Sequence, residues 1–466
     1  MKLSLRNLGP IKDGEIELSD LTVFIGKPNS GKSTAMKAIF HSLFFPPRLI
    51  TLKIDNVSLN NNTANISFSI NREEIISNFN NFIKDSLPQR GEFKLHPVNV
   101  LDFVLNNKLS YKESTHLTFS QFFLPSKCSD SDIKNIRNAL EKTKYNIEIN
   151  GEVGKVSFNL GLDQEHCLND EDFIRNISSS IISEIENKIN LIYSEHFYAK
   201  LKEMCNISCI TYIPYGRSLL ILEKMMELEE APEDIFNKIA FQFTKALNPD
   251  FKISRPYYFS EYFNKLNQVK LNDKIYKIVK PLLHGDFVLV KDKLIYEESG
   301  EYIPWKYVSS SVLEIISLLL SLGEGEMILY EEPETQFHEE LQLLIAMILY
   351  SLSATNHIVI STHSQTITYT LSHLSLLKPT KEEVKELFKS LGLTNYEDLA
   401  EAIEFANKKP VNIKFYHFDK GKVREVSAEE VNKGMPGTQD VLEKEFKWFS
   451  SLYSKRIFGE NTNASS

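Results

Sequence analysis

Cysteine is scarce in this chain: its 466 residues contain four, Cys128, Cys167, Cys205 and Cys209. Their irregular spacing excludes the disulfide framework of a small secreted scaffold. A zinc site of the usual kind is also excluded, because the Cys205-x3-Cys209 pair has no second pair of ligands. We therefore expect reduced, structural thiols.

Long hydrophobic runs are absent as well. The longest, residues 312–322, contains Glu314 and is far shorter than the ~20 apolar residues that span a bilayer. The start of the chain carries charges along its whole length, so it lacks the uncharged core of a signal peptide. These absences predict a cytoplasmic protein with no membrane partner.

The chain has no excess of positive charge: 53 Lys and Arg oppose 62 Asp and Glu, which gives a net charge of −9. A protein that coats nucleic acid is therefore disfavoured, because counterion release needs many clustered cations, although a local basic groove for DNA stays open. The other proportions, 42% hydrophobic and 25% charged, are those of a globular protein, and the length predicts two or three domains or lobes.

A phosphate-binding loop is the first motif present. Residues 2–25 have the pattern of a hairpin that leads into a buried strand, and residues 33–45 have that of a helix. Between them, Gly26-Lys-Pro-Asn-Ser-Gly31-Lys32-Ser33 fits G-x4-G-K-[ST]. This setting points backbone N–H groups and a helix N-terminus into one concavity, as a phosphate chain requires. We expect Lys32 to reach the β- and γ-phosphates of a nucleotide and Ser33 to bind Mg²⁺.

Polar residues follow two later buried strands, residues 327–330 and 357–361. Glu331 and Glu332 come after the first and are expected beside the phosphate loop, because the carboxyl ends of parallel strands share one edge of a sheet. One acid would hold the water shell of a metal and the other would orient or deprotonate an attacking water; a solvated helix start is the alternative. His363 comes after the second strand and can contact a γ-phosphate or that water, with a structural histidine as the alternative.

The remaining patterns place these motifs in a fold. Helical patterns over residues 309–322, 339–353 and 364–374 alternate with the two strands, which predicts a parallel α/β sheet covered on both faces. Isoleucines spaced by three or four over residues 174–192 predict a core-packing helix of only a few turns. The patterns also predict strands at 64–70, 155–159, 210–213 and 287–290, helices at 218–228 and 232–247, and a hairpin at 413–422. Most of residues 90–170 has no assignable pattern.

Four motifs follow one another along the chain: the phosphate loop, the segment Ser309-Ser-Ser-Val-Leu-Glu314, the acids after the strand at 327–330, and His363. This is their order in an ABC-type ATPase head. The chain resembles AAA-family ATPases of the branch that contains SMC proteins, RecF proteins and the ATPase domains of OLD-family proteins. The resemblance implies an α/β P-loop NTPase of ABC type, with a mixed or parallel sheet core, a β-rich lobe and a compact α/β insertion. The implied domains are residues 1–90 (first part of the head), 91–204 (insertion), 205–430 (second part of the head) and 431–466 (tail).

The resemblance also implies the role of each motif. Glu331 would be the Walker B acid that holds Mg²⁺ with Ser33, Glu332 the catalytic base, His363 the switch histidine and Ser309 the first serine of the signature motif. Because a signature motif completes the site of a facing subunit, ATP would be held in trans between two copies, a homo-oligomer built around a nucleotide sandwich. The implied ATP contacts are Gly26, Asn29, Ser30, Gly31, Lys32, Ser33, Thr34 and, in trans, Ser309. This signature lacks the usual glycines, which let the backbone approach a nucleotide closely. Ser309 and the helix start after it must therefore make the contact with the nucleotide.

One more segment, Tyr212-Ile-Pro-Tyr-Gly-Arg217-Ser218, is similar to the Tyr-[Ile/Leu]-Pro-x-x-Arg-Ser segment of OLD-like relatives. Arg217 would then contact a phosphate or a partner subunit. A structural salt bridge is an equally good interpretation.

The biological role has three interpretations. Residues 364–466 contain no D-x-D, so the Toprim nuclease of OLD-family proteins is missing there, and we expect an ATPase that controls a separate nuclease or toxin effector in antiphage or foreign-DNA defence. The alternative is a RecF- or SMC-like DNA-binding clamp in DNA repair or maintenance, although the insertion is too compact for an SMC arm. A small-molecule kinase fits the phosphate loop but leaves Ser309 and His363 without a role.

Overall fold

The structure is a computed structural model, and it describes residues 1–60, 63–84, 87, 91–117, 130–159, 171–218, 221–222, 273–290, 293–320, 325–434 and 448–449. These residues form two compact units. The first unit comprises Met1–Ser42, Asp85–Val98 and Leu201–Ser466, and the second comprises Leu43–Lys84 and Asn99–Lys200. Cys128, Cys167, the helix expected at 232–247 and most of that at 218–228 and of the tail lie outside the described residues.

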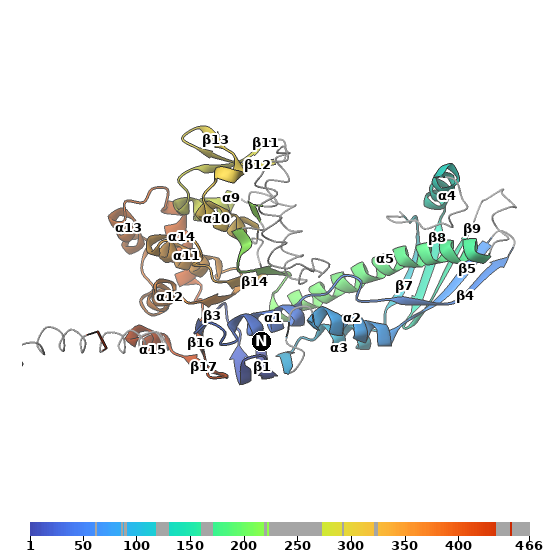
Figure 1. Cartoon of the computed structure of the whole chain (residues 1–466), viewed down its shortest axis with the longest axis horizontal. Coiled ribbons are helices and arrows are strands. Elements are labelled where there is room, and N and C mark those ends of the chain that lie inside the picture. Colours follow the sequence, from blue (N-terminus) through green and yellow to red (C-terminus); the bar gives the residue numbers. More distant parts are fainter. Residues whose placement is uncertain are drawn as a thin grey trace, which may run out of the picture. The chain divides into compact units, whose positions relative to one another are not determined.

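A nine-stranded mixed sheet, in the order β10-β14-β15-β3-β16-β17-β2-β1-β6, organises the first unit (Figure 1). The first five strands of this order are parallel: β10 (Cys209–Ile213), β14 (Glu326–Glu331), β15 (His357–Thr362), β3 (Leu21–Gly26) and β16 (Ile413–Asp419). The other four are β17 (Lys422–Val426), β2 (Ile11–Glu17), β1 (Lys2–Leu8) and β6 (Glu92–His96), and the pairs β16–β17, β2–β1 and β1–β6 are antiparallel. The chain therefore has the mixed α/β fold that the sequence predicts.

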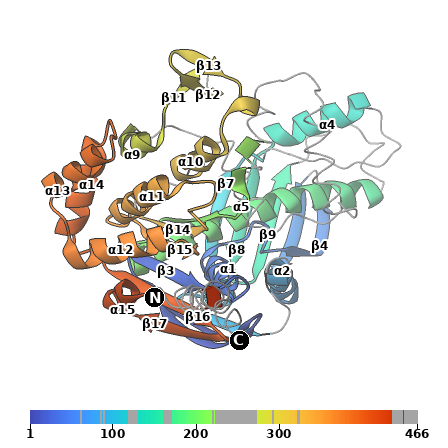
Figure 2. The same ribbon diagram turned by 60° about the vertical axis from the view of Figure 1, so that its left-hand side comes forward.

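Helices pack on both faces of this sheet because successive strand side chains point to opposite faces. Leu21, Val23 and Ile25 of β3 join one apolar core with residues of α10, α11, α12 and α14. On the other face, Phe40 of α1 meets Tyr212 of β10 with ring centroids 5.6 Å apart. Figure 2 shows α11 and α12 together on one side of β14 and β15. The helices of this unit are α1 (Lys32–Leu43), α9 (Asp273–Val279), α10 (Ser310–Leu320), α11 (Glu339–Leu352), α12 (Gln365–Leu377), α13 (Lys381–Ser390), α14 (Glu397–Lys408) and α15 (Ala428–Lys433).

A small three-stranded sheet precedes α10. Its strands are β11 (Asp286–Val290), β12 (Lys293–Glu298) and β13 (Glu301–Ile303), and the short 3-10 helices η1 (Lys280–Leu282) and η2 (Trp305–Tyr307) flank them. Trp305 is fully buried, stacks on Phe287 at 6.3 Å and donates its indole N–H to the carbonyl oxygen of Leu294 at 3.2 Å. This contact anchors the segment from which α10 begins.

The second unit contains an antiparallel sheet in the order β4-β5-β9-β8-β7. Its strands are β4 (Leu52–Asn60), β5 (Thr63–Ile70), β7 (Ser110–Thr115), β8 (Tyr145–Asn150) and β9 (Val153–Asn159), and its helices are α2 (Arg72–Lys84), α3 (Val100–Asn106), α4 (Asp130–Lys142) and most of α5 (Glu171–Cys205). The division differs from the expected ranges, because residues 43–84 belong to the second unit whereas β6 returns to the first. Pairing of β5 with β9, far along the chain, draws the earlier segment into this sheet.

Helix α5 corrects the expectation of a few turns, because it spans 35 residues, about ten turns. The predicted stripe is buried at Ile177, Ile181, Ile185 and Ile189, and it continues through two aromatic residues and a leucine that the isoleucine spacing does not show. These further buried side chains are Tyr193, Phe197 and Leu201.

Within the described ranges, no helix combines the length and the hydropathy that a bilayer-spanning segment requires.

Candidate active site

The phosphate-binding loop joins β3 to α1, and its backbone requires glycine at two positions. Gly26 has a φ of +143°, and a Cβ atom there would lie 2.4 Å from the carbonyl oxygen of Phe418. Gly31 has a φ of +106°, and a Cβ atom would lie 2.5 Å from Cγ1 of Ile11. Since α1 begins at Lys32, its first N–H groups, which have no partner within a helix, lie at this loop.

The other residues expected to contact ATP lie on the same loop and helix start. Asn29 is exposed and left-handed, with a φ of +59°, and Ser33 is also exposed. The Ser30 hydroxyl is buried, and Thr34 is half-buried in the first turn of α1. All four residues thus lie just beyond the carboxyl end of β3, in the loop or in the first turn of α1.

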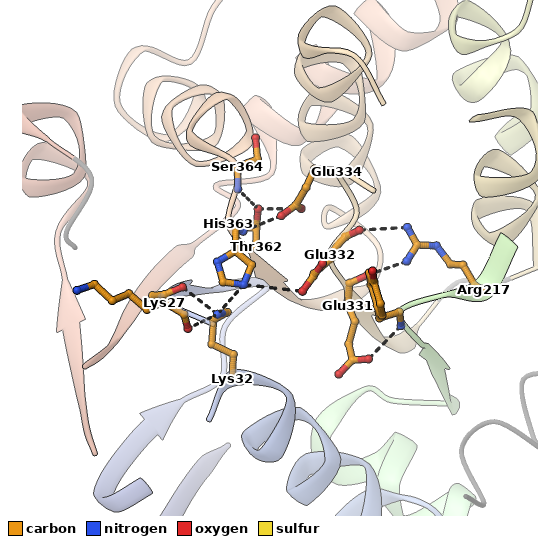
Figure 3. Close-up of polar contacts among 11 residues, drawn as sticks. Lys27, Lys32, Arg217, Glu331, Glu332, Glu334, Thr362, His363 and Ser364 are labelled. Atoms are coloured by element: carbon orange, nitrogen blue, oxygen red, sulfur yellow. Dashed lines mark hydrogen bonds and ion pairs between the residues drawn. The ribbon is translucent and has the colours of Figure 1, made fainter. Parts of the chain in front are cut away.

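The ammonium group of Lys32 is held by the phosphate loop itself. Its Nζ atom donates to the carbonyl oxygens of Gly26 at 2.9 Å and Lys27 at 3.1 Å, and it lies 3.1 Å from Nε2 of His363 (Figure 3). Burial lowers the pKa of Lys32 to about 8, whereas the charges of Glu332 and Glu334 oppose this shift. The side chain is therefore mainly a cation at neutral pH, as binding of a phosphate requires.

The strand order explains why distant residues meet at Lys32. Strand β15 lies between β3 and β14, and all three run parallel. Their carboxyl ends therefore share one edge, where the phosphate loop, His363 and Glu332 follow successive strands of the sheet. The sequence predicts that the residues after these strands lie beside the phosphate loop, and in the structure His363 lies next to both Lys32 and Glu332.

His363 contacts both of its neighbours through one ring nitrogen. Nε2 lies 3.1 Å from Nζ of Lys32 and 3.8 Å from Oε1 of Glu332. Burial, with a smaller contribution from the charge of Lys32, lowers the pKa of His363 to about 4. Because an ammonium group only donates, Nε2 accepts its hydrogen bond and the imidazole proton resides on Nδ1. The contact with Glu332 is consequently not an ion pair at neutral pH.

Glu332 stands at the end of β14 in a left-handed conformation, with a φ of +43°. A residue with a Cβ atom rarely adopts this conformation, and such strain is typical of functional sites. Its N–H donates to the carbonyl oxygen of Ser361 at 2.8 Å. Burial raises the pKa of Glu332, and the neighbouring carboxylates of Glu334 and Glu331 raise it further. A raised pKa brings a carboxylate closer to the range in which it works as a general base.

Glu331 points away from His363 and is 5% exposed (Figure 3). Its Oε1 accepts from the hydroxyl of Tyr212 at 2.8 Å, and its Oε2 accepts from the N–H of Tyr215 at 3.0 Å. A carboxylate has about four acceptor positions, so two stay available. With the exposed hydroxyl of Ser33, this carboxylate supplies the hard oxygen donors that Mg²⁺ takes together with water and substrate phosphates. The residues present therefore fit a magnesium ion.

Ser309 forms the start of α10. Its Oγ atom accepts from the N–H of Val312 at 3.4 Å and lies 3.0 Å from the hydroxyl oxygen of Ser311. Ser309 is exposed, and Ser310 donates to the side chain of Gln336 at 3.3 Å. The expected signature motif is thus an exposed helix start beside the loop that follows β14.

Arg217 lies at the opposite side of Glu332 from His363, and its side chain is 0% exposed. It forms an ion pair with Glu314 of α10, which is also 0% exposed. Of the interpretations drawn from the sequence, the structure therefore shows the buried salt bridge.

Residues 1–368 match the AAA ATPase domain family. The chain belongs to this family. The match covers the phosphate loop, Glu331, Glu332 and His363, so the site described above lies within the matched residues. No curated protein matches this chain.

Three solved structures resemble this chain at low identity. An SMC head bound to the C-winged helix domain of ScpA is 11% identical, with 93% of this chain and 99% of that chain covered and a TM-score of 0.31. An SMC head with an extended coiled coil, bound to the C-terminal domain of ScpA derived from Pyrococcus furiosus, is 11% identical, with 95% and 98% covered and a TM-score of 0.30. The SMC head domain from Thermotoga maritima is 10% identical, with 91% and 97% covered and a TM-score of 0.29. The fold of this chain is therefore described from its own sheet order and from the family match.

The sequence assigned no role to Glu334, which holds His363 in place within the ATPase domain. Its Oε1 accepts from the backbone N–H of His363 at 2.6 Å, and its Oε2 accepts from the hydroxyl of Thr362 at 2.9 Å. Burial raises the pKa of Glu334, although these hydrogen bonds lower it. The available signal was the third acid of the run Tyr330-Glu-Glu-Pro-Glu334, which lies one turn beyond the strand end.

Proposed function

We propose that this chain hydrolyses ATP to ADP and phosphate at the site formed by its phosphate loop, Glu332 and His363. The observation that carries the proposal is the position of Nε2 of His363, 3.1 Å from Nζ of Lys32 and 3.8 Å from Oε1 of Glu332. A cation for phosphates, a neutral imidazole and a carboxylate of raised pKa thus lie within one site. Phosphoryl transfer to water depends mainly on such positioning and on charge.

Each group has a distinct task in this reaction. The loop N–H groups and Lys32 bind the β- and γ-phosphates, and Glu332 orients the attacking water and accepts its proton. The neutral His363 holds the γ-phosphate or that water by a hydrogen bond. Ser33 and Glu331 would hold Mg²⁺, which when bound neutralises charge on the phosphate oxygens.

Lys32→Ala tests nucleotide binding directly. We expect fluorescent ATP analogue binding to be lost in Lys32→Ala and retained in Lys12→Ala, a change of an exposed lysine in the hairpin before β3. Equal binding by the two variants would show that the phosphate loop does not hold the nucleotide.

We propose further that two copies bind two nucleotides between them, each copy offering Ser309 to the site of the other. Support comes from the exposed start of α10, where the first N–H groups of a helix favour an anion. The Glu332→Gln variant with ATP and Mg²⁺ should sediment as a dimer, and the same variant with an added Ser309→Arg change should sediment as a monomer. A Glu332→Gln protein that stays monomeric at saturating ATP would contradict the sandwich.

The ATPase cycle is proposed to control a separate nuclease or toxin effector in antiphage or foreign-DNA defence, in the manner of an OLD-like ATPase without its nuclease. The lack of a D-x-D in residues 364–466 supports a separate effector. Co-purification of the Glu332→Gln dimer with the product of a neighbouring nuclease or toxin gene would support this role. Duplex DNA that stimulates turnover and binds with a steep salt dependence would instead indicate a RecF- or SMC-like clamp, for which the net charge of −9 gives no support.

A further inference from the structure

The guanidinium group of Arg217 connects three elements of the first unit. Nη1 donates to the carbonyl oxygens of Pro214 at 3.2 Å and Glu331 at 2.8 Å, and Nη2 donates to that of Glu332 at 3.2 Å. Nε forms the ion pair with the Glu314 carboxylate on α10. The guanidinium carbon also lies 4.5 Å from the ring centroid of Tyr330. The planar guanidinium group therefore links the residue after β10, the end of β14 and the helix α10.

This arrangement is rigid for a physical reason. A buried cation is tolerated only when its charge and its donors are matched, and the guanidinium fork fixes the directions of its donors. The Glu314 carboxylate satisfies one edge of the fork, whereas the carbonyl oxygens of Glu331 and Glu332 satisfy another. A lysine cannot replace it, because a compact ammonium group does not span both edges.

The fork acts on the backbone of Glu332, which is the residue in the strained conformation. One side of that residue is held by β15, through its N–H and the carbonyl oxygen of Ser361 at 2.8 Å. The other side is held by Arg217, through the carbonyl oxygen of Glu332 at 3.2 Å. With both backbone groups fixed at a φ of +43°, the carboxylate is directed to within 3.8 Å of His363.

We propose that Arg217 is a positioning residue that holds the Glu332 carboxylate in its working direction, and that Glu314 makes this direction depend on α10. Because Ser309 stands at the start of α10, a ligand or partner that binds Ser309 then affects the base of the same chain. The inference rests on the proposed ATPase function, in which Glu332 is the base.

The double variant Arg217→Met with Glu314→Leu tests the proposal. It removes both charges together, so no unpaired ion is left buried, and such exchanges are commonly neutral for folding. We expect a kcat lowered roughly tenfold to 10²-fold with the ATP KM changed less than about twofold, because misplacement of a catalytic group costs rate rather than phosphate binding. A merely structural role would lower stability without this split between kcat and KM.

A second variant, which is isosteric, tests the proposal if the double variant does not fold. Glu314→Gln keeps Arg217 on the two carbonyl oxygens but weakens the link to α10, so kcat should fall several-fold at unchanged KM, whereas Glu340→Gln on the exposed start of α11 should have no effect. A folded double variant, or Glu314→Gln, with wild-type kcat overturns the inference, as does a parallel loss of ATP analogue binding. Absence of turnover in the wild-type chain would instead overturn the proposed ATPase function, which separates the two failures.

Discussion

Nε2 of His363 accepts a hydrogen bond from Nζ of Lys32 across 3.1 Å, and this contact joins the phosphate loop to the end of β15. It also fixes the protonation of both groups at neutral pH: Lys32 is charged, because its pKa is about 8, and His363 is neutral, because its pKa is about 4. A charged imidazole would repel the ammonium group beside it. The pair is therefore arranged for a phosphate anion to be bound by Lys32 while the histidine offers a neutral polar group.

The pH dependence of nucleotide binding follows from the lowered pKa of Lys32. Phosphate binds the charged form, so the apparent affinity for ATP should be constant from about pH 6 to 7.5 and fall as the pH rises through about 8. Titration of a fluorescent ATP analogue between pH 6 and pH 10 measures this. In Lys32→Arg the guanidinium stays charged, so the alkaline fall should disappear; an unchanged fall would assign it to another group.

Replacement of His363 by Gln should lower kcat on the order of 10²-fold while analogue binding persists. The glutamine keeps a hydrogen-bonding group, but it does not reproduce the ring that lies between Lys32 and Glu332. His357, at the opposite end of the same strand, provides the matched control, and His357→Gln should turn over at the wild-type rate. Equal kcat values for the two variants would show that His363 has no role in catalysis.

Glu334→Gln should lower both the stability of the domain and its kcat. The carboxylate accepts from the His363 N–H and from the Thr362 hydroxyl, and an amide keeps a single acceptor oxygen, so a buried group loses its partner. The expected cost is about 1–3 kcal/mol of unfolding free energy, measured by urea denaturation, together with a lower kcat. Glu339→Gln, at the exposed start of α11, is the control and should change neither quantity.

Gly31→Ala should abolish analogue binding and cost about 1–3 kcal/mol of stability, because the residue has a φ of +106° and its new methyl group would lie 2.5 Å from Ile11. Gly151→Ala is a matched comparison, since Gly151 also has a positive φ, +64°, but nothing lies within 4 Å of the added methyl group. Denaturation curves of the two variants separate backbone strain from the clash. A Gly31→Ala protein that binds ATP normally would contradict the assigned loop geometry.

Local patterns predict the part of the fold that carries the site. The expected strand at 327–330 is β14 (Glu326–Glu331), and the expected helix at 339–353 is α11 (Glu339–Leu352), because buried parallel strands and covering helices each have a strong period. The phosphate loop is predicted as well, since it needs glycine where the backbone is left-handed at Gly26 and Gly31.

Tertiary pairing determines what the sequence does not show. The second sheet depends on β5 finding β9, and no local pattern encodes that partner. The same holds for side chains: the sequence singles out Arg217 but does not identify Glu314 as its partner, and their burial as a pair appears only after α10 packs near β14. The role of Glu334 likewise depends on β15 lying next to β14, which brings His363 within its reach.

Phosphate release by the wild-type chain and by Glu332→Gln, with saturating ATP and Mg²⁺ at pH 7.5, tests the central claim most directly. Because the base is lost while Lys32 and the loop are kept, the account predicts steady turnover by the wild type, a rate lower on the order of 10²-fold in Glu332→Gln, and equal analogue binding by both. Equal phosphate release by the two proteins would contradict it.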